Sequence, residues 1–510
     1  MAHLGSRRRR ALALPAGLAL TASLGFLPAG AASAAPAESA PAAVRTDGPK
    51  LSYVVNVDGG QGTAKAVKKA IAKAGGTAVI AYDQIGVIVV HSQNPDFAKT
   101  IRTVRGVQSA GATRTAPLAA AGDTAIESER PLTAAEAQSA AAKAGDDQDP
   151  LEPLQWDLGA IKADKAHQKS LGSKKVTVAV IDTGVDDTHP DLAPNFDRGA
   201  SVSCVGGVPN TADGAWRPGP DESDHGTHVA GTIAAAKNGV GVTGVAPGVK
   251  VSGIKVSQPD GFFYTEAVVC GFVWAAEHGV DVTNNSYYTD PWLFNCKNDA
   301  DQKALIDAHA RAIRYAERKG AVNVAAAGNS RMDLAADQLT DTSSPNDTTP
   351  AERIVNPREC LDIPTQIPGV VTVSALGAKN LKSSYSNYGH GVVDISAPGG
   401  DSTAFQKPDA PATDGRILST LPGGKYGYKA GTSMASPHVA GVVALIKSTH
   451  RSASPAAVKA LLYKQADDTA CTNPYDINGD GVVDAVCEGS KRDNGFYGTG
   501  VADALDAVRR

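Results

Sequence analysis

The chain has 510 residues, a formal net charge of −4 and a hydrophobic content of 42%. This length exceeds that of one ordinary domain, so the chain should contain several segments with separate roles. The charge shows no excess of Lys and Arg, which argues against nucleic acid as a partner.

Residues 1–35 have the organisation of a secretory signal peptide. Four arginines at residues 7–10 precede a mostly apolar stretch at residues 11–30, and small residues follow at residues 31–35. A single transmembrane helix is the alternative, but these flanks are typical of a segment that is removed after export. We therefore predict a secreted, extracellular protein without a stable membrane anchor.

Residues 50–115 predict a small α+β module. Its expected elements run strand, helix, strand, strand, helix, strand, at residues 51–57, 62–74, 77–82, 86–90, 95–104 and 107–113. This order is the split βαβ, or ferredoxin-like, arrangement. Residues 116–149 are rich in alanine and polar side chains, which indicates a solvated linker with a helix at residues 133–144.

Residues 150–510 alternate apolar strands with helices. The expected strands are residues 176–181, 249–256, 280–283, 321–326, 370–375 and 392–395, the helices include 225–237, 265–278 and 301–318, and a hairpin covers 417–429. Buried strands that alternate with helices predict an α/β domain, a parallel sheet covered by helices on both faces. Functional side chains should gather outside the carboxyl ends of those strands.

A serine lies at the start of an expected helix, in the sequence GTSMASPH at residues 431–438. Apolar residues at 439, 442, 443 and 446 follow helical spacing, so the helix should begin near Ser433 with Pro437 in its first turn. The N–H groups and dipole of a helix start favour a developing negative charge. For an isolated serine, a simple N-cap would be the alternative.

Two further segments carry the partners that a nucleophilic serine requires. The apolar run VTVAVIDTG at residues 176–184 ends in Asp182, and DHGTHVAGT at residues 224–232 opens a helix with His225. The order Asp, His, Ser is that of subtilisin, whereas chymotrypsin and the α/β-hydrolases have other orders. The three segments together resemble the signatures of the subtilisin-like serine proteases (peptidase S8).

The resemblance implies the catalytic roles. His225 would be the general base, Asp182 would orient it, and Ser433 would be the nucleophile. Asn329, in the segment VAAAGN at residues 324–329, matches the family's oxyanion-hole donor. His228 competes for the role of base, and a metal site at His225 and His228 is disfavoured because their spacing is not i, i+4.

Substrate binding is where the chain departs from the family pattern. The family's peptide-pairing edge corresponds to Asn285, Ser286 and Tyr287, where tyrosines replace glycines. Backbone pairing with an extended peptide remains expected, while the tyrosines should narrow or reshape the pockets. The segment Ala326, Ala327 and Gly328 should form one smooth pocket wall.

The module at residues 50–115 resembles the family's inhibitor-type propeptide (inhibitor I9). This implies an intramolecular inhibitor and folding aid that is cut from the protease within residues 116–149. A ligand-binding ferredoxin-like domain is the alternative.

The six cysteines all lie after residue 150, and an even count in a secreted protein favours three disulfides. Cys471 and Cys487 bracket one short loop and are the best pair, whereas Cys270, in an apolar helix, could instead be a free thiol.

The loop between Cys471 and Cys487 resembles the start of an EF-hand, with Asp476, Asn478, Asp480 and Asp484 as oxygen ligands but Cys487 at the twelfth position. It predicts either a stabilising calcium site or an Asx-rich turn.

Taken together, the residues and the resemblance predict a secreted serine endopeptidase of protein or peptide substrates, made as a precursor, with no cofactor required for its chemistry. The alternatives are a non-catalytic binding protein on the same fold and an esterase-type acyl hydrolase, because a triad alone does not choose the acyl group. A metallopeptidase would differ by losing activity to a chelator.

Overall fold

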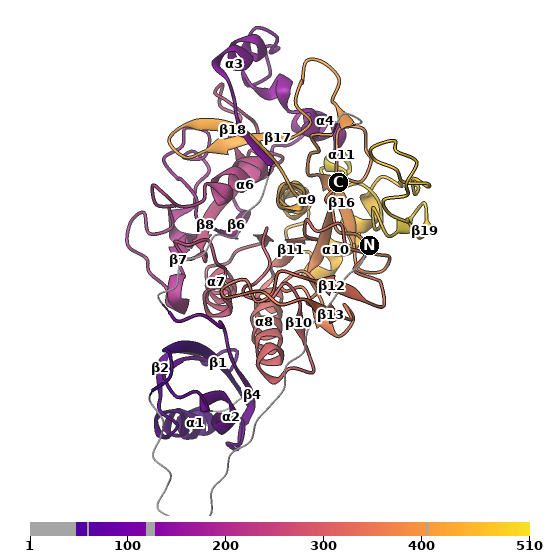
Figure 1. The fold of residues 1–510 in the computed structure, drawn as a ribbon. Coiled ribbons are helices and arrows are strands. Elements are labelled where there is room, and N and C mark those ends of the chain that lie inside the picture. The colour runs from indigo at the N-terminus through magenta and orange to yellow at the C-terminus, as the bar shows by residue number, and fades with distance from the viewer. Residues whose placement is uncertain (1–46, 59–60, 119–127, 404–405, 510) are drawn as a thin grey trace, which may run out of the picture. The chain divides into compact units, whose positions relative to one another are not determined.

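Seven parallel strands form the central sheet, in the order β16-β15-β11-β9-β6-β8-β7 (Figure 1). In chain order they are β6 (Thr177–Asp182), β7 (Val202–Ser203), β8 (Lys250–Lys255), β9 (Val282–Asn285), β11 (Val322–Ala326), β15 (Val371–Leu376) and β16 (Ile395–Pro398). This is a computed structural model, and it describes residues 47–58, 61–118, 128–403 and 406–509. The predicted signal peptide at residues 1–35 lies outside the described residues.

Helices cover both faces of this sheet, as its apolar strands require. In β6, Val178 and Val180 point into the core formed with α6 (His225–Ala234) and α9 (Thr432–Thr449). The intervening Ala179 and Ile181 point into a second core formed with α7 (Thr265–Glu277) and α8 (Ala300–Lys319). A strand buried on both sides carries no polar alternation, which is why its sequence reads as a continuous apolar run. The predicted α/β fold class is confirmed.

The N-terminal module has the predicted order of elements. They are β1 (Leu51–Val57), α1 (Gln61–Lys73), β2 (Gly76–Tyr82), β3 (Val87–Ser92), α2 (Phe97–Ile101) and β4 (Val107–Ala112). All neighbours in its sheet, β2-β3-β1-β4, pair antiparallel. One face of this sheet packs on the module's own helices, with Val55 and Ile88 in that core, while Val54 and Val89 on the other face join the core of α7 and α8.

The segment that links the module to the rest of the chain contains an unpredicted strand. This strand, β5 (Ser128–Pro131), pairs antiparallel with β18 (Lys425–Ala430), which forms a hairpin with β17 (Ile417–Leu421). The next helix, α3 (Ala134–Ala141), lies in the predicted helical stretch and begins with a capping box between Thr133 and Glu136. The strand was missed because four mostly polar residues have no apolar period, and only pairing with a distant hairpin makes them a strand.

Other elements are short or shifted relative to the predicted ranges. The helix predicted at residues 225–237 ends at Ala234, and the strand predicted at residues 392–395 lies at Ile395–Pro398. The remaining elements are α4 (Trp156–Ala160), α5 (Ala163–His167), β10 (Asn295–Cys296), β12 (Leu339–Asp341), β13 (Arg353–Val355), β14 (Cys360–Leu361), α10 (Pro455–Gln465), β19 (Gly489–Ser490), β20 (Asp493–Asn494) and α11 (Ala504–Ala507).

Three disulfides pair all six cysteines. The bonds are Cys204–Cys270, Cys296–Cys360 and Cys471–Cys487. The predicted Cys471–Cys487 pair is present. The alternative of a free thiol at Cys270 is wrong, because β7 ends beside α7 and brings Cys204 to it.

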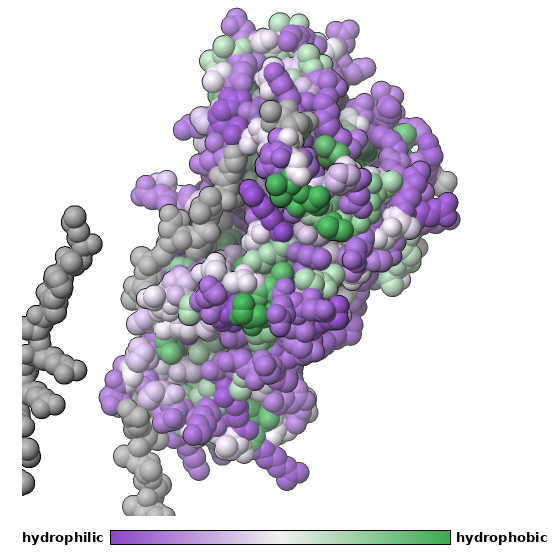
Figure 2. Space-filling view, turned by 45° about the vertical axis from the view of Figure 1, so that its right-hand side comes forward, coloured by the Kyte–Doolittle hydropathy of each residue, from purple (hydrophilic) through white to green (hydrophobic). Residues whose placement is uncertain are grey.

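The surface shown in Figure 2 is largely hydrophilic, with apolar side chains in small separated groups. Among the described residues, the exposed large apolar side chains are Val208, Val240, Ile354, Val482, Val483 and Val486. No helix in the described ranges is both long and apolar enough to cross a membrane.

Candidate active site

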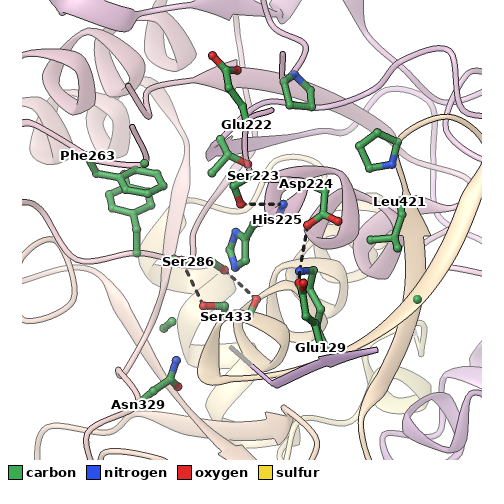
Figure 3. Close-up of a pocket in the computed structure, with 18 of the residues that line it drawn as sticks. Glu129, Glu222, Ser223, Asp224, His225, Phe263, Ser286, Asn329, Leu421 and Ser433 are labelled. Atoms are coloured by element: carbon green, nitrogen blue, oxygen red, sulfur yellow. Dashed lines mark hydrogen bonds and ion pairs between the residues drawn. The ribbon is translucent and has the colours of Figure 1, made fainter. Parts of the chain in front are cut away.

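The predicted catalytic residues lie at one pocket at the carboxyl ends of β6, β9 and β11, which His225, Asn329 and Ser433 line, while Asp182 is fully buried beside His225. Asp182 ends β6, Ser286 follows β9, Asn329 follows β11, and Ser433 lies at the start of α9. Figure 3 shows His225, Ser286 and Ser433 near one another at the centre of this pocket, with Asn329 at its lower edge in that view.

Asp182 and His225 form a buried hydrogen-bonded pair. The Nδ1 atom of His225 lies 2.7 Å from Oδ1 of Asp182, whose side chain is fully buried. The same oxygen accepts the N–H of Thr183 at 2.7 Å, and the Thr183 hydroxyl accepts the N–H of Gly226 at 2.9 Å. Since Gly226 lies where a Cβ would be 2.4 Å from the carbonyl of Gly184, only glycine lets α6 approach β6 this closely. The aspartate is thereby placed to hold the imidazole in one orientation and tautomer.

Ser433 is held against the residue that follows β9. Its Oγ donates to the carbonyl of Ser286 at 3.3 Å, and Oγ of Ser286 donates to the carbonyl of Ser433 at 2.9 Å. The helix begins at Thr432, next to the predicted start. Pro437 is the sixth helical residue, so the prediction that it lies in the first turn is wrong.

The side chain of Asn329 is oriented by Thr432. Its Oδ1 accepts both the N–H and the hydroxyl of Thr432, each at 2.8 Å. With Oδ1 occupied, the exposed amide directs its Nδ2 donor toward the pocket. Gly328 has φ +95, and a Cβ there would lie 2.5 Å from Nδ2 of Asn387, so the turn before Asn329 requires glycine.

His228 lies away from the pocket, in the contact between α6 and the hairpin. Its Nε2 lies 3.1 Å from the carbonyls of both Ile417 and Gly427, and its ring is fully buried. His228 therefore stabilises the contact between α6 and the hairpin, whereas His225 lines the pocket.

The expected substrate-binding residues divide into lining and buried ones. Ser286, Tyr287, Ala326 and Gly328 line the pocket. Asn285 is fully buried, its amide donating to the carbonyl of Val324 at 3.0 Å, and Ala327 is buried as well. Tyr288, the second tyrosine of the expected peptide-pairing segment, lines the pocket too. Two further lining residues, Asp290 and Asp362, were missed because they lie in irregular segments where no spacing marks them.

The loop with the expected calcium ligands is exposed and internally hydrogen bonded. Oδ1 of Asp476 accepts the N–H of Gly479 at 2.7 Å, and Oδ2 of Asp484 accepts that of Ile477 at 2.9 Å. Asn478 Nδ2 donates to Asp480 at 2.9 Å. Within the described ranges, no group of three or more His, Cys, Asp or Glu side chains is arranged to hold a metal ion.

The sequence comparisons agree with this geometry. The model of the subtilase family matches residues 173–500. Subtilisin BL of Lederbergia lenta is 33% identical over 330 residues, which cover 65% of this chain and 96% of that protein. The chain belongs to the subtilase family. It is therefore a serine endopeptidase, and a subtilase needs no cofactor for its chemistry.

Other relatives extend the similarity. Subtilisin E of Bacillus subtilis is 35% identical to this subtilase over 295 residues, which cover 58% of this chain and 61% of that protein. Among solved structures, the epidermin leader peptide processing serine protease of Staphylococcus aureus is 25% identical, with a TM-score of 0.64 over 90% of this chain and 98% of that chain. A protease from Pseudoalteromonas arctica is 28% identical, with a TM-score of 0.52 over 71% of this chain and 99% of that chain.

Proposed function

We propose that this subtilase is a secreted endopeptidase whose catalytic residues are Asp182, His225, Ser433 and Asn329, and that removal of its N-terminal module activates it. The observation that carries the proposal is the 2.7 Å contact between Asp182 and His225 in the pocket that Ser433 and Asn329 also line. The substrates are proteins or peptides, in keeping with the family.

Each residue has a defined step in peptide hydrolysis. His225 accepts the proton of the Ser433 hydroxyl as the oxygen attacks the peptide carbonyl, and Asp182 stabilises the resulting imidazolium. The oxyanion that forms receives hydrogen bonds from Nδ2 of Asn329 and the N–H of Ser433, one of the donors left unpaired at a helix start. His225 then protonates the leaving amine, and water hydrolyses the acyl-enzyme by the same route.

A site-mapping experiment tests this assignment. The mature enzyme is treated with a fluorophosphonate, digested, and searched by mass spectrometry for the modified peptide. We expect one adduct, on Ser433, with parallel loss of peptide hydrolysis and no loss after treatment with a chelator. An adduct elsewhere would refute the assignment, and loss to the chelator alone would indicate a metallopeptidase.

Two substrates separate the alternative functions. An endopeptidase hydrolyses an internally quenched peptide as well as the matching ester, whereas an esterase hydrolyses only the ester. A binding protein on this fold hydrolyses neither. We expect hydrolysis of both substrates.

We propose that the N-terminal module is the inhibitor and folding aid of this enzyme. Residues 44–510 form one compact unit, in which the module packs on α7 and α8. Its Arg114 pairs with the fully buried Glu266 at 2.5 Å, and Asn56 donates to the carbonyl of Ala304 at 2.9 Å. The module buries side chains of α7 and α8 that would otherwise be exposed to solvent. Because the module binds these helices only when they are folded, docking stabilises the folded protease.

The strand β5 indicates where the precursor is cut. Glu129, Arg130 and Pro131 line the same pocket as Ser433, and β5 is paired with β18 along its length. On the other side, the N–H of Ala116 donates to Asp347 at 3.0 Å. Since both flanks are anchored, the maturation bond should lie between residues 118 and 128. N-terminal sequencing of the mature enzyme tests this, and a mature N-terminus after residue 131 would contradict it.

For the loop of Asp476, Asn478, Asp480 and Asp484 we propose a structural calcium ion. Backbone N–H groups of Gly481, Gly479 and Asp480 lower the pKa of Asp476, so the loop presents an ionised carboxylate. Cys487 is in a disulfide and supplies no bidentate ligand, which should make binding weak. Calcium should raise the midpoint of thermal unfolding of wild type but not of Asp480→Ala, and an equal response of both would contradict the site.

A further inference from the structure

A buried carboxylate, Asp362, lies where the two walls of the substrate pocket meet. One wall continues from β9 through Tyr288, and the other from β11 through Ala326 and Gly328. The segment that carries Asp362 forms hydrogen bonds with both walls. The N–H of Thr289 donates to the carbonyl of Ile363 at 2.8 Å, and the hydroxyl of Thr365 donates to the carbonyl of Ala326 at 2.7 Å.

The carboxylate of Asp362 has no partner among the residues that the structure describes. The residue is 2% exposed, and its Oδ1 is buried without a hydrogen bond. Its Oδ2 would lie 3.6 Å from a Cβ at Gly328, so the carboxylate is directed at the glycine wall. Burial without compensation raises the pKa of Asp362 well above its usual value. A buried polar group without a partner costs free energy, so one that lines a substrate pocket is a candidate for pairing with a bound ligand.

The neighbouring carboxylate, Asp290, differs in this respect. It also lines the pocket and is buried, but it accepts the N–H of Phe263 and the amide of Asn346, each at 2.6 Å. The carboxylate of Asp290 therefore stabilises the pocket wall through these hydrogen bonds, whereas that of Asp362 is available to a substrate.

We propose that Asp362 binds the positively charged side chain of Arg or Lys immediately before the scissile bond, so that the enzyme cleaves after basic residues. This inference rests on the proposed peptidase function of the same site. The walls formed by Tyr288 and by Ala326 and Gly328 would contact the aliphatic stem, and the cationic head would reach Asp362. A neutral side chain of the same length would leave the carboxylate unpaired.

The charge of the rest of the cleft favours the same substrates. Besides Asp362, the protease residues that line it include more carboxylates than ammonium groups: Asp221, Glu222, Asp224, Asp260 and Asp290 against Lys425 and Lys429. Lys429 pairs with Asp224 at 2.9 Å and with Glu129, and Glu222 pairs with Lys255. Asp221, Asp260 and Asp290 then remain against Lys425, which leaves the balance negative. An acidic cleft raises the local concentration of basic peptides.

The maturation segment does not follow this preference. Residues 119–127 read AAAGDTAIE and contain no Lys or Arg. An intramolecular cut has a high effective concentration, so a neutral side chain suffices for it.

The test compares quenched peptides that differ only in the residue before the scissile bond, with Arg, Lys, citrulline or norleucine at that position. Citrulline has nearly the shape of Arg but no charge. For the mature wild type we expect kcat/KM for Arg or Lys to exceed that for citrulline and norleucine about 30-fold or more. Asp362→Asn should lose this preference, because its kcat/KM for Arg and Lys should fall toward that for citrulline. Asp394 accepts the N–H of Thr372 at 2.8 Å and is not among the residues that line the cleft, so Asp394→Asn is the matched control and should keep the wild-type preference.

The outcomes separate the two proposals. If wild type cleaves citrulline or norleucine peptides as well as Arg and Lys peptides, Asp362 does not select charge. If Asp362→Asn lowers all four rates equally, the residue only maintains the fold, and the inference fails. The citrulline comparison in wild type decides the matter even if the variant does not fold. A wild type that neither turns over any peptide nor reacts with a fluorophosphonate would instead refute the peptidase function.

Discussion

Pro437 influences the active site through a hydrogen bond that it cannot make. A helical residue four positions after Ser433 would normally donate its N–H to the Ser433 carbonyl, but proline has no N–H. The freed carbonyl accepts the hydroxyl of Ser286 at 2.9 Å instead. The helix start that carries the nucleophile is thereby joined to the strand end that forms the pocket wall.

The proposed oxyanion contact of Asn329 leads to a quantitative prediction. Asn329→Ala should lower kcat by about 10²–10³-fold with little change in KM, the size measured for the corresponding donor of subtilisin itself, because the lost bond forms mainly with the oxyanion. Steady-state kinetics on a quenched peptide provide the measurement. Thr432→Ser, which keeps a hydroxyl to orient Asn329, is the matched control and should retain most of the activity. A rise in KM with unchanged kcat would show that Asn329 binds substrate rather than the oxyanion.

Lys382 is a buried cation that does not line the pocket of the proposed catalytic residues. It is 1% exposed, and its Nζ donates to the carbonyls of Ser383 at 3.0 Å and Ser386 at 3.1 Å. The rings of Tyr388, Tyr475 and Phe496 surround it, with the Tyr475 centroid 5.0 Å away. Burial lowers the pKa of Lys382 to about 8.

This pKa predicts how stability changes with pH. Between about pH 8 and pH 10.5 the unfolded chain keeps the proton on Lys382 while the folded protein loses it, so the contribution of this group to stability rises with pH. From about pH 7.5 to about pH 9.5 the free energy of unfolding should increase by about 2 kcal/mol relative to Lys382→Met. Urea unfolding in a Ser433→Ala background, which prevents autolysis, measures the difference. A difference that does not change with pH would mean that the carbonyls and rings keep the folded ammonium charged.

At the scale of elements, the sequence predicted those helices and strands whose apolar residues follow a regular spacing or form a continuous run. The strand that ends at Asp182 and the helix that starts near Ser433 were predicted because their apolar residues are continuous or follow helical spacing. The strand β5 was not, because its structure comes from pairing with β18. Asp362 was missed for a similar reason. The hydrogen bonds that hold its segment in the pocket join it to Thr289 and Ala326, which are distant in the sequence.

The docking of the module on α7 and α8 predicts the effect of one substitution. Arg114→Met leaves Glu266 without its guanidinium, and removing one partner of a buried ion pair costs about 2–5 kcal/mol. The cut module should then dissociate sooner, so proteolytic activity appears earlier after secretion. Time courses of peptide hydrolysis in the culture medium provide the measurement. Arg105→Met, at an exposed position of the same module, is the control, and equal activation times for the two variants would contradict the role of the Arg114 pair.

At the scale of the whole molecule, one sheet positions all of the proposed catalytic groups. Its parallel strands bring the ends of β6, β9 and β11 to the same edge, and α9 crosses that edge with Ser433 in its first turn. The N-terminal module contacts α7 and α8, while residues of β5 line the pocket itself. The precursor therefore contains all of the proposed catalytic residues, which is the basis for predicting self-processing.

The most direct test is the intact mass of the secreted protein, wild type beside Ser433→Ala, with both exposed to a fluorophosphonate. We expect a wild type that is shortened by the module and labelled once, and a variant that stays at precursor length without a label. If a folded, secreted wild type stays at precursor length and unlabelled like the variant, the chain is not a self-activating serine protease.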